Sequence, residues 1–164
     1  MSVHHGKLHH KTPGWVPSAA RFHIRIRLDG AQRPLTDAQV APELLDSAAF
    51  YHEHQRWYAW LFLLMPDHLH AVLSFPIDAA MSGVIGDWKR YQAGRHGIVW
   101  QEGYFDHRLR NEDQAAEKYH YIRMNPVRQD LCRAPEEWPW VVEPWKASLA
   151  QASSVVARDL RARA

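Results

Sequence analysis

Two apolar segments joined by a Pro-Asp turn restrict the fold of this chain more than any other feature. Residues 57–65 are almost entirely apolar and have the length of a buried strand, and residues 68–75 form a second such segment. The connection Met65-Pro66-Asp67 suits a tight turn, because proline fixes its backbone angle and an aspartate side chain can hydrogen-bond the turn backbone. The sequence therefore predicts a buried β-hairpin. Neither segment approaches the roughly 20 apolar residues of a membrane-spanning helix, so no membrane association is expected.

The remaining pattern predicts one more clear strand and three helices. Residues 21–28 alternate between apolar and basic or histidine side chains, which is typical of a strand, and Asp29-Gly30 ends it. Helical spacing predicts helices from Thr36 or Asp37 to about His54, from about Met81 to Ala93, and from Asn111 or Asp113 to about Met124, where Asn125-Pro126 stops or kinks the chain. Residues 99–110 hold a further strand or loop–strand pair. This order predicts an α+β fold on the split β-α-β plan, an antiparallel sheet with helices on one face and an added C-terminal helix that bears tyrosines.

Length and composition limit the organisation to one domain. The chain has 164 residues, a formal net charge of +2 and 12 histidines, and a chain of this length holds a single core. We expect an irregular basic arm over residues 1–20, one domain over residues 21–145 and a tail over residues 146–164. The single cysteine, Cys132, excludes an internal disulfide and favours a reducing cytoplasm.

The first candidate site is His68-Leu69-His70. Residues two apart on a strand point to the same face, so the two imidazoles lie side by side at a distance that suits one metal ion. Leu69 faces the other way and helps to bury the strand. In a chain with 12 histidines, the triplet can also be a coincidence.

The second candidate site is on the third predicted helix. Tyr121 and Asn125 are four residues apart and therefore neighbours on one helix face, so a phenol lies beside an amide that can bind a metal. Tyr119 fits less well, because its neighbour at the same spacing is Arg123, which cannot bind a cation. The alternative is that the tyrosines pack in the core and that Asn125 before Pro126 caps a helix.

Basic residues interleaved with aromatic ones form the third feature. Such a mixture can follow phosphates and stack on bases, and the alternative is a solvated surface balanced by 18 acidic residues. The candidate DNA-binding residues are Arg21, Arg25, Arg27, Lys89, Arg90, Arg108, Arg110, Arg123 and Arg128. Glycine-rich nucleotide-binding loops are absent from the sequence, so no nucleotide cofactor is expected.

Four segments in order resemble one known family. Residues 64–73, LMPDHLHAVL, resemble the histidine-hydrophobic-histidine strand of the single-tyrosine (HUH) transposases, and residues 121–128, YIRMNPVR, resemble their tyrosine helix. Residues 100–110 and 22–28 are similar to segments of the branch associated with repetitive extragenic palindromes (REP). The resemblance covers roughly residues 13–140. It departs from the family after Arg128, where Gln129-Asp130-Leu131 replaces a small residue, glycine and leucine.

The resemblance implies a ferredoxin-like fold, a divalent metal, and cleavage and rejoining of single-stranded or hairpin DNA. By this resemblance Tyr121 is the nucleophile, and His68, His70 and Asn125 are ligands of Mg²⁺ or Mn²⁺. Attack by Tyr121 would give a 5′-phosphotyrosine that conserves the bond energy, so that rejoining needs no ATP. We expect a cytoplasmic, nucleoid-associated protein, and the sequence leaves monomer and homodimer open.

Two other functions remain open from the sequence. One is a DNA-binding module that has lost catalysis and binds or regulates palindromic repeats. The other is a metal-dependent hydrolase that recruits Asp67 and Glu117 to the two histidines. Formation of a covalent protein–DNA bond distinguishes both from a transposase.

Overall fold

The computed structural model describes residues 20–146, and it contains one five-stranded antiparallel sheet. The elements are β1 (Arg21–Arg27), α1 (Ala41–Glu53), β2 (Tyr58–Leu64), β3 (His68–Ser74), α2 (Met81–His96), β4 (Phe105–Leu109), α3 (Glu112–Arg128), the 3₁₀ turn η2 (Pro135–Glu137) and β5 (Val141–Val142). Neighbouring strands follow the order β4-β1-β3-β2-β5. Because β3 lies between β1 and β2, the first two strands of the chain are not neighbours in the sheet. The predicted N-terminal arm and C-terminal tail lie almost wholly outside the described residues.

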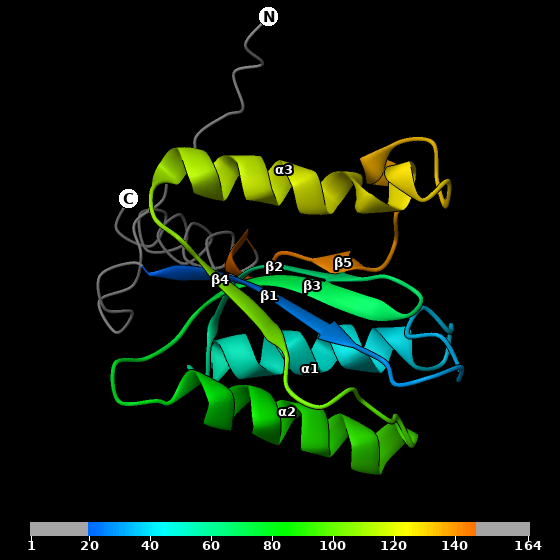
Figure 1. Cartoon of the computed structure of the whole chain (residues 1–164), viewed down its shortest axis with the longest axis horizontal. Coiled ribbons are helices and arrows are strands. Elements are labelled where there is room, and N and C mark those ends of the chain that lie inside the picture. The colour runs from blue at the N-terminus through cyan, green and yellow to red at the C-terminus, as the bar shows by residue number, and fades with distance from the viewer. Residues whose placement is uncertain (1–19, 147–164) are drawn as a thin grey trace, which may run out of the picture.

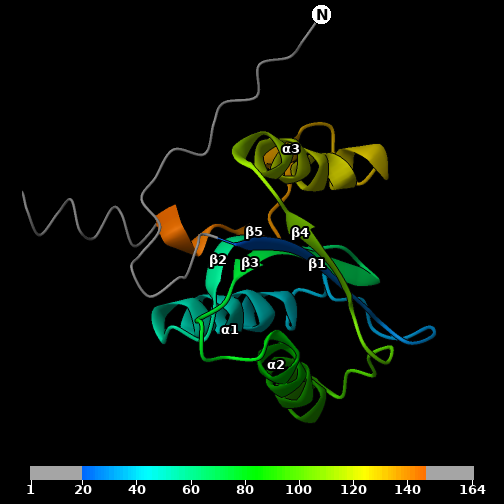
Figure 2. The ribbon, with the colours of Figure 1, turned by 60° about the vertical axis from the view of Figure 1, so that its left-hand side comes forward.

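The sheet is the middle layer of three. Helices α1 and α2 cover one face, and α3 lies across the other face (Figures 1 and 2). This arrangement agrees with the predicted sheet, with its two helices on one face and the added tyrosine-bearing helix. Among residues 20–146, no helix is long and apolar enough to cross a membrane.

Each face of the sheet has its own hydrophobic core. Trp57 and Trp88 are buried in the core on the side of α1 and α2, whereas Trp60 is buried in the core beneath α3. Burial of these large aromatic side chains supplies much of the hydrophobic stabilisation in a domain of this size. These three tryptophans are core residues, so their rings are not exposed for stacking on bases.

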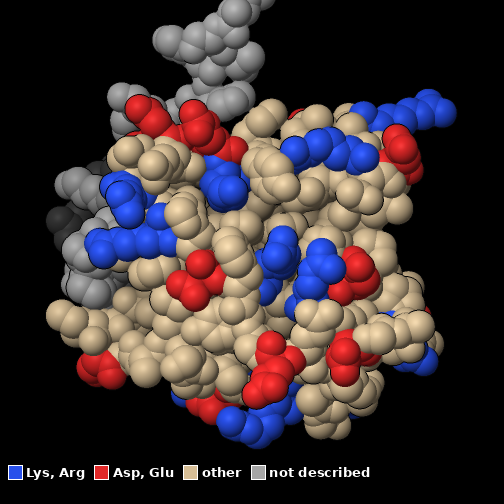
Figure 3. All heavy atoms as spheres, in the orientation of Figure 1, with Lys and Arg blue, Asp and Glu red and all other residues tan. Residues whose placement is uncertain are grey.

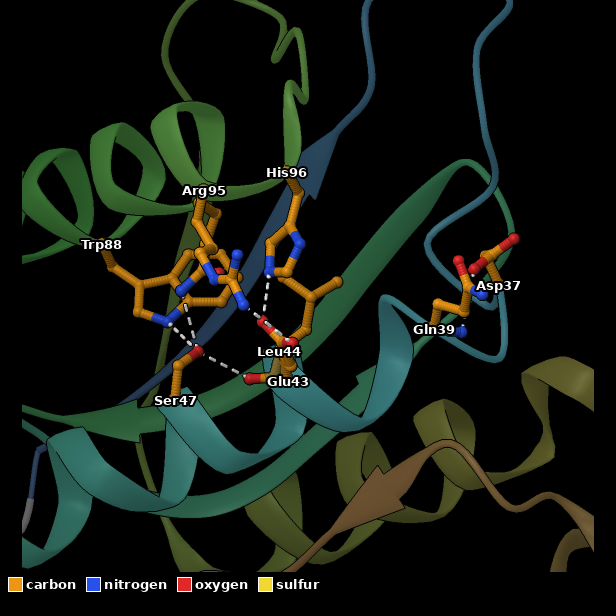
Figure 4. A network of polar contacts seen from close by, with 9 residues as sticks. Asp37, Gln39, Glu43, Leu44, Ser47, Trp88, Arg95 and His96 are labelled. Carbon is orange, nitrogen blue, oxygen red and sulfur yellow. Dashed lines mark hydrogen bonds and ion pairs between the residues drawn. The ribbon is translucent and has the colours of Figure 1, made fainter.

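A polar cluster joins α1 to α2 within the first core. The Ser47 hydroxyl donates to the Leu44 carbonyl at 2.8 Å and accepts from the indole of Trp88 at 3.0 Å. Glu43 of α1 pairs with Arg95 and His96 at the end of α2 (Figure 4). This cluster lies in the helical layer opposite α3, so it fixes the scaffold rather than the candidate site.

Helix α3 corrects the alternative that the helix stops at Asn125-Pro126. Pro126 lies inside the helix, which continues to Arg128, and Asn125 is therefore not a cap. Proline removes one backbone hydrogen bond, but the helix resumes with a bond from the Gln129 amide to the Asn125 carbonyl at 3.0 Å. Ile122 and Pro126 are both buried, and their burial offsets the lost bond. The cap is at the other end, where the Asn111 side chain accepts from the Gln114 amide at 2.9 Å.

Candidate active site

Strand pairing brings three histidines onto the sheet face beneath α3. Arg25 lies opposite His70, and Arg27 lies opposite His68, in the antiparallel pair of β1 and β3. His23 is two residues before Arg25 and shares its face. The apolar residues between them, Ile24, Ile26 and Leu69, point into the core on the side of α1 and α2. Alternation along the two strands thus separates the scaffold face from the face that carries the histidines.

The histidines form a continuous chain of short contacts that begins at Asp67. The Asp67 carboxylate accepts from Nδ1 of His68 at 2.6 Å, and Nε2 of His68 lies 3.1 Å from Nε2 of His70. On its other side, Nδ1 of His70 lies 2.9 Å from Nε2 of His23. Since Nδ1 of His68 carries its proton toward Asp67, its Nε2 is an acceptor. Either a proton or a cation must therefore lie between the two Nε2 atoms.

The donor set fits a divalent first-row metal ion. Imidazole nitrogens bind such ions at about 2.0–2.1 Å, so nitrogens 3.1 Å apart subtend roughly a right angle at the ion. Asn125, whose amide oxygen is the atom that could bind an ion, is nearly buried. Over the same residues no three His, Cys, Asp or Glu side chains gather at one metal position. Asp67 contacts Nδ1 of His68 instead, so the carboxylates of the hydrolase alternative are not assembled here.

Burial keeps the imidazoles neutral. Desolvation, aided by the neighbouring His68 and His23, lowers the pKa of His70 to about 2. Desolvation and the nearby Lys118 ammonium lower the pKa of His23 to about 4. The pKa of His68 is also lowered by burial, although Asp67 opposes the shift. At neutral pH all three rings are therefore uncharged, which is the form that binds metal ions.

Tyr121 lies on α3 between two cations. The Lys118 ammonium is 4.8 Å from the centre of the Tyr121 ring, and the Arg128 guanidinium is 4.0 Å from it. Lys118, Tyr121 and Asn125 are spaced three and four residues apart, so they share one side of the helix. Because Lys118 also lowers the pKa values of His23 and His70, this side of α3 faces the histidines.

Tyr121 lies at the level of His70 along the sheet. The salt bridge between Arg21 and Glu112 at 3.0 Å fixes the start of β1 beside the start of α3, and both elements run in the same direction (Figure 1). Nine helical residues from Glu112 to Tyr121 advance about 13 Å, and four strand residues from Arg21 to Arg25 advance about 13 Å as well. Arg25 is the cross-strand partner of His70. Tyr121 is 43% exposed, and the Lys118 ammonium lies over its ring.

Of the three arginines predicted to form a basic strand face, two stand beside the histidines and one is buried. Arg27 is exposed and Arg25 is half-buried, and both stand directly beside the histidine pair. Arg21 is buried at 4% and gives both of its terminal nitrogens to Glu112, over the ring of Trp60. The alternation is visible in the sequence, but the pairing of Arg21 with Glu112 is not. Because Arg21 is buried and paired, it has a structural role and is not an exposed phosphate contact.

The other predicted basic residues are dispersed. Lys89 and Arg90 lie on α2 in the opposite layer, where Lys89 donates to the carbonyls of Gln101 and Gly103 and Arg90 pairs with Asp87. Arg108 pairs with Phe22 across the strands and so shares the scaffold face, and Arg110 follows β4 as an exposed residue. Arg123 is two residues from Tyr121 and points to the other side of α3. Of the two predicted arginines on α3, Arg128 is the one that lies against Tyr121.

The surface around the site carries both signs of charge. Basic side chains lie along the level of the sheet and α3, with acidic side chains interspersed (Figure 3). The formal net charge of +2 agrees with this mixture. Affinity for an anion would thus come from the few cations beside the histidines, not from the charge of the whole molecule.

Comparison with solved structures shows which fold the chain shares. A solved structure of the REP-associated tyrosine transposase bound to a REP hairpin superimposes with a TM-score of 0.66, at 19% sequence identity, over 81% of this chain and 82% of that one. At this identity the match shows the fold, and it confirms the predicted architecture.

Comparison with curated protein sequences finds a relative with significant similarity to part of the chain. The REP-associated tyrosine transposase of Escherichia coli (strain K12) is 27% identical over 85 residues, which span 50% of this chain and 50% of that protein. The resemblance expected from the four segments is thereby confirmed, although the alignment covers only half the length of the relative. No family model matches the chain.

Two residues of the site, His23 and Lys118, could not be predicted from the sequence. His23 stands among arginines in an alternating strand, and only the pairing of β1 with β3 places it against His70. Lys118 has no motif around it. The spacing of three residues before Tyr121 is the one signal that places it on the same helix side.

Proposed function

We propose that the chain is a transposase-like enzyme that cleaves and rejoins single-stranded DNA through Tyr121, at hairpin-forming repeats. One observation carries the proposal: two imidazole Nε2 atoms meet at 3.1 Å on the sheet face that the tyrosine helix covers. The similarity to REP-associated tyrosine transposases supports the same reaction class. The superimposed transposase is bound to a REP hairpin, which supports hairpin DNA as the substrate.

His68 and His70, with Asn125 as the third ligand, would hold Mg²⁺ or Mn²⁺. When bound, the ion would supply Lewis-acid stabilisation of the charge on the scissile phosphate. Mixed imidazole and amide ligation suits Mn²⁺ better than Mg²⁺, which prefers oxygen ligands. Asp67 orients His68 through Nδ1, because the hydrogen bond at 2.6 Å fixes the tautomer that leaves Nε2 free.

Tyr121 provides the nucleophile. Its phenolic oxygen forms a bond to phosphorus while the bond from phosphorus to the 3′-oxygen breaks. The phenol gives up one proton to solvent and the departing 3′-oxygen takes one, so the products are a 5′-phosphotyrosine and a free 3′-hydroxyl. A phenol with an ordinary pKa near 10 is a weak nucleophile. The Lys118 ammonium, 4.8 Å from the ring, would attract the scissile phosphate toward the phenol.

Arg25, Arg27 and Lys118 would hold the phosphates around the scissile bond. Lys118 is half-buried, and no carboxylate within residues 20–146 forms a salt bridge with it. A half-buried cation without a counter-ion, beside neutral histidines, attracts an anion into the site. Unpaired DNA suits the site because its bases can stack on aromatic side chains without a melting cost.

Covalent capture tests the proposal. The protein is incubated with Mn²⁺ and a hairpin oligonucleotide taken from the flanks of its gene, labelled at the 3′ end in one sample and at the 5′ end in another. We expect a protease-sensitive adduct that retains only the 3′ label, together with a 5′-labelled product that a polymerase can extend. Tyr121→Phe should abolish the adduct while DNA affinity stays within about twofold, because only the phenolic oxygen is lost.

The control is Tyr119→Phe, a substitution of the same kind on the same helix, which should keep full adduct formation. An adduct that persists in Tyr121→Phe and disappears in Tyr119→Phe would move the nucleophile to Tyr119. The joint substitution His68→Ala with His70→Ala should remove metal-dependent cleavage. Wild-type protein that binds the hairpin but yields no adduct at any metal concentration would instead identify a DNA-binding module without catalysis.

A further inference from the structure

His23 occupies a defined position against His70. Its side chain is 4% exposed, its Nε2 lies 2.9 Å from Nδ1 of His70, and the two rings stack with centres 5.2 Å apart. Phe105 of β4 packs edge-on against the other side of the ring, at 5.6 Å between centres. The ring is therefore held in place between β3 and β4.

The chain from Asp67 to His23 admits two arrangements of protons. In the first, His23 donates from Nε2 to Nδ1 of His70, and His70 donates from Nε2 to Nε2 of His68. Each of these contacts then has one donor and one acceptor. In the second, His70 carries its proton on Nδ1 and donates to His23, so the Nε2 atoms of both His68 and His70 are free to bind an ion.

We infer that His23 is a positioning residue for the metal site, whose ring changes tautomer together with His70 when an ion replaces the proton between His68 and His70. This inference rests on the proposed function. One proton moves from Nε2 to Nδ1 within His70, and one moves from Nε2 to Nδ1 within His23, so none is gained or lost by the pair. Nδ1 of His23 is buried and has no partner among residues 20–146, and it is the atom that receives the second proton.

An imidazole is suited to this role because its Nε2 can either donate or accept. A metal-bound histidine that loses the partner of its other nitrogen typically loses 10–100-fold in metal affinity. A glutamine at position 23 carries an amide that can present either its oxygen or its nitrogen to His70, whereas leucine presents neither. The two substitutions therefore separate the hydrogen bond from the volume of the side chain.

Affinity for Mn²⁺ alone, measured by titration calorimetry on the full chain, tests the inference. We expect His23→Leu to weaken binding 10–100-fold and His23→Gln to retain affinity within a few-fold. His107 lies opposite His23 on β4 and is exposed, so His107→Leu is the matched control and should bind as wild type. Thermal melts of each variant establish that it is folded at the titration temperature.

Nitrogen-15 NMR of the wild-type histidines gives a second measurement that needs no variant. We expect both His23 and His70 to carry the proton on Nε2 without metal and on Nδ1 after addition of Zn²⁺ as a diamagnetic probe. Protons on the same nitrogens in both states, or wild-type Mn²⁺ affinity in folded His23→Leu, would overturn the inference. If His68→Ala with His70→Ala leaves Mn²⁺ affinity intact, the proposed metal site fails and this inference fails with it.

Discussion

At the scale of single residues, the spacing of side chains in the sequence predicted which residues share a face. It did not predict which residues they contact. The separation of Tyr121 from Asn125 placed both on one side of a helix, and the structure keeps them there while burying Asn125 and exposing Tyr121. His68 and His70 were predicted to share a face because strands alternate, and their Nε2 atoms meet. His23 could not be predicted, because its role depends on a partner 47 positions away.

Acid should destabilise the metal-free protein through His23. In the unfolded chain this imidazole binds a proton near pH 6.5, whereas the folded protein holds its pKa at about 4. Between these values the unfolded state binds more protons, so the free energy of unfolding decreases as the pH falls from 6.5 toward 4. The loss approaches about 1.4 kcal/mol per pH unit for this group. Urea unfolding in EDTA at pH 7, 6 and 5 measures it.

The variant His23→Gln isolates the contribution of this one group. As the pH falls, the free energy of unfolding of wild type should decrease relative to that of His23→Gln. A wild-type minus His23→Gln difference that is constant from pH 7 to pH 5 would contradict the assigned shift.

At the scale of elements, local patterns predicted which strands and helices exist better than where they end. The alternation of residues 21–28 predicted β1 to within one residue. The second helix was expected to end at about Ala93 but continues to His96, because Gly97, with a φ of 68°, provides the left-handed ending. In α3, Pro126 indicated a stop on local grounds, but burial of the helix against the sheet overrides it. Tertiary packing of this kind is not visible in the sequence.

The link between β1 and α3 gives a prediction about Arg21. Arg21 joins the two elements through two hydrogen bonds to Glu112 and lies 3.9 Å from the centre of a Trp60 ring. Arg21→Met should lower the free energy of unfolding by about 1–3 kcal/mol, toward the lower end because Glu112 is half-exposed. Its affinity for hairpin DNA, measured by fluorescence anisotropy, should stay within about twofold.

Arg27→Met is the matched comparison on the same strand, and the opposite pattern is expected for it. Because Arg27 is exposed, its loss should leave stability nearly unchanged and weaken DNA binding. Equal losses of DNA affinity in the two folded variants would contradict this prediction and would indicate that Arg21 also contacts phosphate.

At the scale of the whole molecule, local charge should dominate DNA binding because the net charge is small. Four cations surround the histidines and Tyr121, namely Arg25, Arg27, Lys118 and Arg128. Each phosphate contact on single-stranded DNA contributes about −0.7 to the slope of log K against log salt, so four contacts predict a slope of about −3. Lys118→Gln should make the slope shallower by about 0.7, measured by anisotropy from 50 to 300 mM salt.

Arg90→Gln provides the control for this slope. Arg90 lies in the opposite layer and pairs with Asp87 at 2.9 Å, so its loss should leave the slope unchanged. A shallower slope in Arg90→Gln that equals the change in Lys118→Gln would mean that DNA follows the α2 layer instead of the histidine face.

Because the core is divided between the two faces of the sheet, tryptophan fluorescence can report on the unfolding of each layer. Trp57 and Trp88 belong to one layer and Trp60 to the other, and all three are buried below 2% exposure. Trp100 packs against the first core, and Trp138 and Trp145 belong with Trp60 beneath α3. Replacing Trp57, Trp88 and Trp100 together by phenylalanine therefore leaves fluorescence mainly from the layer beneath α3, and replacing Trp60, Trp138 and Trp145 leaves it mainly from the other layer. Coincident emission changes on unfolding would identify a single cooperative unit, and an earlier red shift from Trp60 would show that the tyrosine helix detaches while the rest stays folded.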